Sequence, residues 1–159
     1  MTIEKYNERQ EHLHPDDPFA RNPLWRTGQG ERAEVAFIAK CFCEYGHQPC
    51  IPVGTDDFDM VVVANKRPLR VQIKSTNNKQ ATITKASNKG NQIKYCYPED
   101  TIDWFALHHI PTDDWYVIPR HLTGDKMSVS FKSLDNKWKN NFNFIDYTED
   151  SGDLEEFFG

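Results

Sequence analysis

Three polar side chains interrupt the apolar stretch FDMVVVANKRPLRVQIKST, residues 58–76. Asp59 stands near its beginning, and Gln72 and Lys74 stand near its end, two positions apart. A carboxylate, an amide oxygen and the backbone carbonyl of Ile73 are ligands that suit Mg²⁺. A lysine ammonium beside them can orient a water or stabilise the charge that develops on a phosphate. The stretch therefore predicts metal-assisted hydrolysis of a phosphodiester.

These side chains can act together only if the stretch folds into a hairpin. The runs rich in Val and Ile predict two strands, and NKRP predicts the turn between them. A two-residue loop at positions 66–67 would pair Asp59 with Lys74. Because side chains alternate between the two faces of a strand, this register places all three polar groups on one face. The opposite face then carries the apolar residues Met60, Val62, Val71 and Ile73.

The segment GQGERAEVAFIAKCFCEYG predicts a helix before the hairpin, and Gly46 supplies its stop. We expect its buried stripe to be Val35, Ile38, Phe42 and Tyr45, which recur at spacings of three and four. Glu34 shares a face with Ile38, so its carboxylate lies at the edge of that stripe. It can add a carboxylate to the hairpin site. Alternatively, it is a first-turn acid that the helix dipole favours.

A helix with Glu (GERAE), a strand that begins at Asp (FDMVVV) and QIK on the next strand resemble, in this order, the PD-(D/E)XK nuclease superfamily. They are most similar to its group I intron homing endonuclease branch, in which Gln replaces an acidic residue. The resemblance implies that Glu34, Asp59, Gln72 and Lys74 are catalytic. It also implies Mg²⁺ (or Mn²⁺) held by Asp59, Gln72 and the Ile73 carbonyl, with Glu34 as a possible further ligand.

The resemblance covers about residues 28–120 and implies an α/β (α+β) fold. Its restriction-endonuclease-like core is a mixed sheet with an early helix and a catalytic β-hairpin. Two features depart from the family pattern: Phe58 stands where a Pro is usual, and Gln72 leaves the site one negative charge short, which weakens metal affinity. Asp56 and Asp57 compete with Asp59 for a metal, but only Asp59 shares the face of Gln72 in the predicted register.

Residues 60–98 contain eight Lys and Arg and no Asp or Glu. Such a bias predicts a surface that binds DNA phosphates, and the alternative is a solvated basic face. The candidate DNA-binding residues are Lys66, Arg67, Arg70, Ser75, Thr76, Asn77, Lys79, Lys85, Lys89 and Lys94. Tyr95 and Tyr97 alternate along one predicted strand and are either core residues or stacking platforms for an unpaired base.

The chain of 159 residues predicts one domain, residues 28–145, with an N-terminal arm over 1–27 and an acidic tail over 146–159. The tail carries six acidic residues, no Lys or Arg, and a Phe157–Phe158 pair near its end. It is either a solubilising tail or a segment that recruits a protein partner or competes with DNA. Further strands are predicted at 81–84, 92–97, 103–110, 115–119 and 127–131.

The composition excludes other classes of protein. No apolar run reaches the length of a membrane span, and the N-terminus has no apolar signal segment, so we expect a cytoplasmic location and no membrane partner. The four cysteines include no CxxC pair and predict no zinc site.

We therefore expect a Mg²⁺-dependent DNA endonuclease of homing or restriction type, acting as a homodimer in a phage or mobile element. A Holliday-junction-resolvase-like nuclease is an alternative. A non-catalytic nucleic-acid-binding or replication-accessory protein is another, and a protein-binding module that uses the tail is a third.

Overall fold

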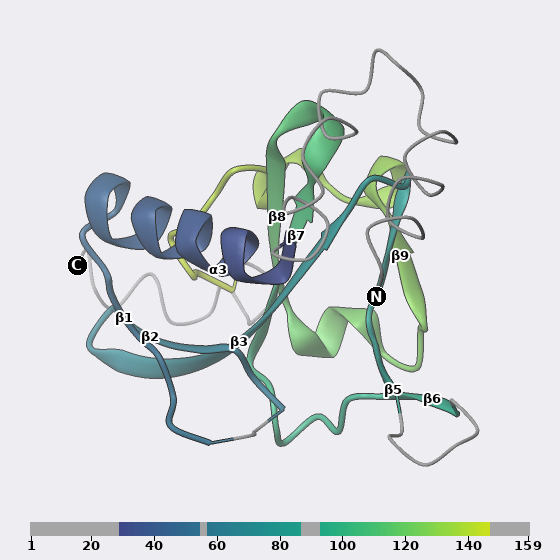
Figure 1. Ribbon diagram of the computed structural model, residues 1–159, viewed down its shortest axis with the longest axis horizontal. Coiled ribbons are helices and arrows are strands. Elements are labelled where there is room, and N and C mark those ends of the chain that lie inside the picture. Colours follow the sequence, from purple (N-terminus) through teal and green to yellow (C-terminus); the bar gives the residue numbers. More distant parts are fainter. Residues whose placement is uncertain (1–28, 55–56, 87–92, 147–159) are drawn as a thin grey trace, which may run out of the picture.

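The computed structural model describes residues 29–54, 57–86 and 93–146 (Figure 1). The helix α3, Gln29–Ala39, continues as the π-helical segment η1, Lys40–Glu44. The main sheet has the order β1-β2-β3-β7-β8, and α3 lies across one of its faces (Figure 1). Its strands are β1 Gln48–Cys50, β2 Met60–Ala64, β3 Arg67–Thr76, β7 Trp104–His109 and β8 Asp114–Pro119. Only β3 and β7 are parallel, so the sheet is mixed and the predicted α/β (α+β) class is confirmed.

Two small ribbons and four 3-10 turns complete the described structure. The ribbons pair β4, Gln80–Thr82, with β9, Ser128–Ser130, and β5, Thr84–Ala86, with β6, Lys94–Cys96. The predicted strand 81–84 is thus divided between two ribbons. The 3-10 turns are η2 Ile110–Thr112, η3 Arg120–Thr123, η4 Phe131–Ser133 and η5 Asn136–Trp138.

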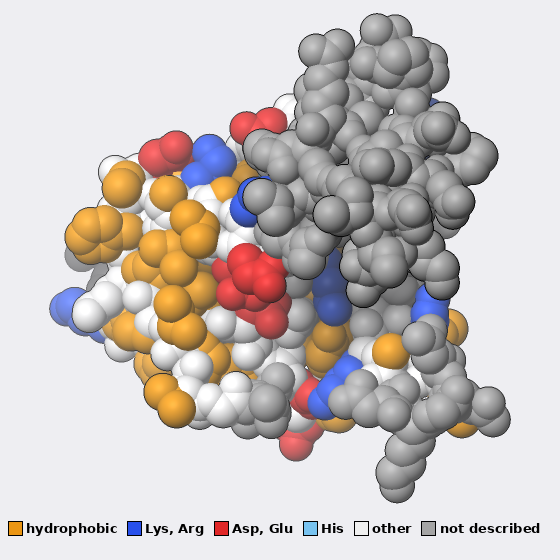
Figure 2. All heavy atoms as spheres, viewed as in Figure 1, with side chains coloured by type: hydrophobic (Ala, Val, Ile, Leu, Met, Phe, Trp, Pro, Cys, Tyr) orange, Lys and Arg blue, Asp and Glu red, His pale blue; other side chains and the backbone are white. Residues whose placement is uncertain are grey.

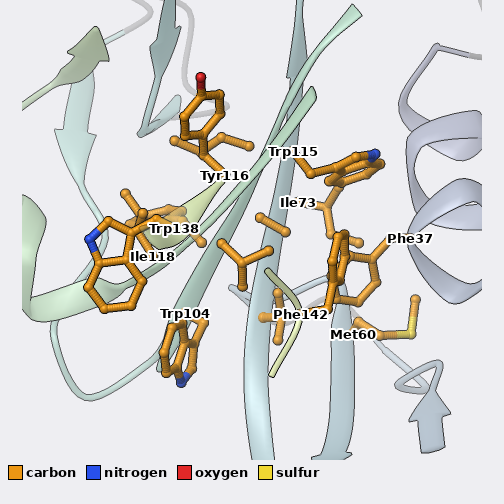
Figure 3. Close-up of a cluster of buried hydrophobic side chains, with 14 of the residues drawn as sticks. Phe37, Met60, Ile73, Trp104, Trp115, Tyr116, Ile118, Trp138 and Phe142 are labelled. Atoms are coloured by element: carbon orange, nitrogen blue, oxygen red, sulfur yellow. The ribbon is translucent and has the colours of Figure 1, made fainter. Parts of the chain in front are cut away.

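The predicted helix is present, but its predicted buried stripe is only half right: Ile38 and Tyr45 are partly buried and pack against the core, whereas Val35 and Phe42 do not. Val35 and Phe42 are 65% and 63% exposed. The buried residues are instead Ala33, Phe37 and Cys41, which are spaced by four. Both sets have helical periodicity, and the choice between them depends on the tertiary partners of Phe37. Its ring lies 5.9 Å from that of Trp115 and 5.7 Å from that of Phe142 (Figure 3).

The turn of the hairpin lies one residue earlier than predicted. Asn65 and Lys66 form it, with φ angles of 52° and 64°, and the strands pair from Met60↔Val71 to Ala64↔Arg67. Asn tolerates the left-handed conformation, whereas the residue before Pro68 favours an extended one, which explains the shift. The predicted pairing of Asp59 with Lys74 is therefore wrong. A shift of two in register preserves the faces, and Met60, Val62, Val71 and Ile73 are buried as predicted.

The core on both faces of the sheet is largely aromatic. Figure 3 shows Trp115 on the α3 side of the strands and Tyr116 on the other side, as alternation along β8 requires. Residues after β9 complete the core through Trp138, Phe142 and Phe144, all of which are buried. The core therefore joins the first described helix to the last described segment.

Of the predicted domain, residues 28–145, the structure describes all but residues 28, 55–56 and 87–92. Asp146, the first residue of the predicted tail, lies 3.4 Å from His121 through its Oδ2 atom. The predicted arm and the rest of the tail lie outside the described residues. In the part of the chain that the structure describes, no helix is both long and apolar enough to cross a membrane.

Candidate active site

Asp59 and Gln72 meet at the open end of the hairpin. Asp59 Oδ2 accepts a hydrogen bond from Gln72 Nε2 at 2.6 Å and another from the backbone N–H of Ile73 at 2.8 Å. Gln72 Nε2 also lies 3.3 Å from the Ile73 carbonyl oxygen. The Asp59 backbone N–H donates to the Val71 carbonyl at 3.0 Å, which fixes the carboxylate to β3. Three oxygen-bearing groups of the predicted ligand set therefore converge on one point.

The candidate metal ligands are partly buried, so the Asp59 carboxylate is poorly hydrated. Gln72 is only 7% exposed. Burial raises the pKa of Asp59 above its usual value, although the Ile73 N–H and the charge of Lys74 act in the opposite direction. Burial and then the negative charges of Asp59 and Glu31 raise the pKa of Glu34. The negative charge of Asp59 therefore acts on Glu34, which lies on α3.

The helix reaches this place through its first turns. Gln29 Nε2 donates to Ser75 Oγ at 3.2 Å, so the start of α3 contacts the end of β3. On the face shown in Figure 2, acidic side chains gather at the end of α3 that meets β3. The structure thus brings Glu34, Asp59, Gln72 and Lys74 to one end of the hairpin.

The donor set fits a hard divalent cation. Two carboxylates, one amide oxygen and one backbone carbonyl are typical of Mg²⁺ or Mn²⁺ sites, in which waters and substrate complete the coordination. Across the ranges 29–54, 57–86 and 93–146, no group of three or more His, Cys, Asp or Glu side chains could hold a metal. The amide and carbonyl oxygens of Gln72 and Ile73 would therefore have to contribute. Gln72 would then present its oxygen in place of the Nε2–H group that now bonds Asp59.

Asp56 and Asp57, the alternatives to Asp59 as a metal ligand, are not part of this cluster in the described structure. Asp57 forms an ion pair with Lys85, which lies on β5. Asp56 is outside the described residues. Asp57 therefore has a cationic partner of its own, whereas Asp59 faces the Gln72 amide.

Candidate DNA-binding residues beside the site follow Lys74 directly. Thr76 Oγ1 accepts from the Asn78 backbone N–H at 3.0 Å, which shapes the turn after β3. A shallow pocket next to that turn is lined by Asn77, Asn78, Lys79, Gln80 and Ser130. Short polar side chains and one lysine thus line a pocket at the turn after β3.

The remaining basic residues lie elsewhere. Lys66 and Arg67 are at the far end of the hairpin, and Arg67 is about 17 Å from Gln72 at the usual rise per strand residue. The Arg70 guanidinium forms two 3.0 Å hydrogen bonds to the carboxylate of Asp103. Lys94 lies on β6, and Lys89 is outside the described residues. The basic segment is therefore distributed over several places on the fold.

Sequence reasoning missed two contacts at the site. The Lys74 ammonium lies 5.4 Å from the centre of the Tyr97 ring, and the Tyr97 carbonyl accepts hydrogen bonds from Arg120. The spacing of Tyr95 and Tyr97 predicts that both lie on one strand face, but Tyr97 is buried whereas Tyr95 is 42% exposed. The spacing could not identify Lys74 as the partner of Tyr97. No pattern in the sequence indicates Arg120.

A Glu-bearing helix thus packs beside a hairpin that carries Asp, Gln and Lys at one end. A model of the PD-(D/E)XK endonuclease family matches residues 26–149, so the chain belongs to this family. Among solved structures, the fold is similar to that of a bacterial homing endonuclease, I-Ssp6803I. The TM-score is 0.58 at 17% identity, and the match covers 68% of this chain and 78% of that one. No curated protein matches the chain.

Proposed function

We propose that this chain is a divalent-metal-dependent DNA endonuclease of homing or restriction type that hydrolyses phosphodiester bonds. The convergence of Asp59 Oδ2, the Gln72 amide and the Ile73 carbonyl beside a second carboxylate carries the proposal. Membership of an endonuclease family supports it, and family membership makes DNA the expected substrate.

Asp59, Gln72, the Ile73 carbonyl and Glu34 would hold Mg²⁺ or Mn²⁺. When bound, the cation lowers the pKa of an attacking water and offsets charge on the phosphate. The chain's own residues position the reactants. Asp59 is fixed by the Ile73 N–H, and Lys74 supplies a positive charge on the same face for the attacking water or the phosphate.

Further parts of the proposal concern how the chain acts. One site of this kind cuts one strand, so cleavage of both strands favours a homodimer. A cytoplasmic location and an origin in a phage or mobile element are also part of the proposal. The acidic tail is proposed to contact a protein partner or to compete with DNA for the basic residues.

Cleavage of plasmid and four-way junction DNA in Mg²⁺ or Mn²⁺ tests this function. We expect wild type to cut and both Asp59→Ala and Lys74→Ala to lose cleavage while still binding DNA. Preference for duplex would support a homing or restriction type, and nicking of junctions would support a resolvase type. If all three proteins bind DNA alike and none cuts it, the chain is a non-catalytic DNA-binding protein.

A further inference from the structure

The ammonium of Lys74 lies over an aromatic ring. Its Nζ atom is 5.4 Å from the centre of the Tyr97 ring, within the range in which the ring face attracts a cation. The ring face therefore limits the positions that this flexible side chain takes.

Tyr97 is well suited to be a fixed support. It is 5% exposed, and its ring makes an edge contact with Phe105 at 5.8 Å between centres. Phe105 is in turn paired with Gln72 across the parallel strands β3 and β7. The ring under Lys74 is thus packed against the strand position beside the candidate metal ligand.

A buried arginine holds the backbone of Tyr97. Arg120 is 6% exposed, and its Nε and Nη2 groups both donate to the Tyr97 carbonyl, the former at 3.2 Å. Its Nη1 group donates to Thr123 Oγ1 at 2.9 Å and to the Gly124 carbonyl at 3.1 Å. These acceptors are all uncharged. These four hydrogen bonds offset the cost of burying the guanidinium, and they hold the Tyr97 carbonyl in place.

We propose that Tyr97 is a positioning residue for the nuclease reaction: its ring, packed against Phe105, holds the Lys74 ammonium in place, and Arg120 fixes the Tyr97 backbone. The role in catalysis rests on the proposed function, whereas the contact between ring and ammonium does not. Because Tyr97 is buried, its effect should fall on the rate of the chemical step and not on the affinity for DNA.

Two variants separate the ring from the hydroxyl. Tyr97→Phe keeps the ring face and should cleave DNA like wild type. Tyr97→Leu removes the face and should lower kcat about tenfold with KM for DNA unchanged. Tyr116→Leu is the matched control, because Tyr116 is similarly buried and its ring contacts Phe131. We expect it to reduce Tm without lowering kcat.

A second readout does not need cleavage. In protein with ¹³C-labelled lysine, the ring should shift the Lys74 side-chain NMR signals upfield, and Lys74→Arg assigns those signals. The shift should be present in wild type, Tyr97→Phe and Tyr116→Leu and absent in Tyr97→Leu.

The inference is overturned if Tyr97→Leu loses the upfield shift but keeps wild-type kcat. It is also overturned if Tyr97→Phe slows cleavage as much as Tyr97→Leu, since the hydroxyl would then be responsible. A wild-type protein that shows the shift but cuts no DNA in Mg²⁺ or Mn²⁺ would instead refute the nuclease function, and with it any role of Tyr97 in the reaction.

Discussion

Gln72 donates its amide N–H to Asp59 Oδ2 at 2.6 Å, so the neutral residue of the motif directly offsets the charge of the acidic one. Without a cation, this bond satisfies a partly buried carboxylate that a second acidic residue would repel. With a cation, the same amide can offer its oxygen. The Asp59–Gln72 pair therefore links the stability of the metal-free protein to its affinity for metal.

Gln72→Glu should lower the stability of the metal-free protein and raise its affinity for metal. The added carboxylate beside Asp59 should destabilise the metal-free protein by about 1–3 kcal/mol at pH 7, because a hydrogen bond is replaced by repulsion between buried acids. Mg²⁺ should restore the stability, since the site gains a charged ligand. Thermal unfolding with and without Mg²⁺ measures both effects. Gln80→Glu, on the exposed edge of β4, is the control and should respond weakly; an equal response of the two variants would contradict the assignment.

Glu34 gives a pH dependence of defined sign. Burial and the charges of Asp59 and Glu31 raise its pKa from the usual 4.5. The Glu34 carboxyl thus binds its proton more tightly in the folded state than in the unfolded state. Its contribution to stability therefore falls as pH rises from 4.5 through the higher pKa of the folded state. Without divalent metal, Glu34→Gln should therefore be more stable than wild type at pH 7, and the difference should shrink toward pH 4.

Urea unfolding between about pH 4 and pH 7 measures this difference. Glu44→Gln is the control, because Glu44 is exposed and pairs with Lys40 at 3.3 Å. A Glu34→Gln protein whose stability relative to wild type does not change with pH would contradict a raised pKa of Glu34, and with it the burial and the nearby negative charges.

Arg70 and Lys79 should differ although both belong to the basic segment. Burial acts against ionisation of Asp103, but hydrogen bonds from the Arg70 side chain and backbone lower its pKa overall. Arg70→Leu should therefore cost about 1 kcal/mol of stability at pH 7, and this cost should vanish as pH falls through the range in which Asp103 protonates. Lys79→Ala should leave stability unchanged and reduce the salt dependence of DNA binding by about one charge. The structure would be contradicted if Lys79→Ala lost stability and Arg70→Leu only reduced the salt dependence of DNA binding.

The corrected turn predicts a stabilising substitution. Lys66 has a φ of 64°, which glycine adopts without strain. Lys66→Gly should therefore stabilise the protein by about 0.5–1 kcal/mol, whereas Arg67→Gly, in the extended strand β3, should destabilise it. If Arg67→Gly is the stabilising variant in thermal unfolding, the turn lies at residues 66–67 instead.

The face shared by Asp59, Gln72 and Lys74 was predictable because side chains alternate with a period of two. An error of two in the pairing register moves the partner of Asp59 from Lys74 to Gln72 and leaves the face unchanged. The family resemblance came from the same residues, and the family match confirms it.

The rest depends on contacts between distant parts of the chain. Phe37 is buried because Trp115 and Phe142 meet it, and neither lies near it in sequence. Arg70 was predicted to bind phosphate because its ion-pair partner, Asp103, lies outside the basic segment 60–98 and could not be identified from it. Local periodicity and charge counts carry no information about such partners.

A crystal soaked in Mn²⁺ tests the central claim most directly through the anomalous signal of the metal. The account predicts a peak bounded by Asp59, the Gln72 amide oxygen and the Ile73 carbonyl, at ligand distances of about 2.1 Å. The peak should be absent in Asp59→Ala. A Mn²⁺ peak elsewhere on the protein, or none at this place in wild type with DNA bound, would contradict a metal-dependent nuclease site at this hairpin.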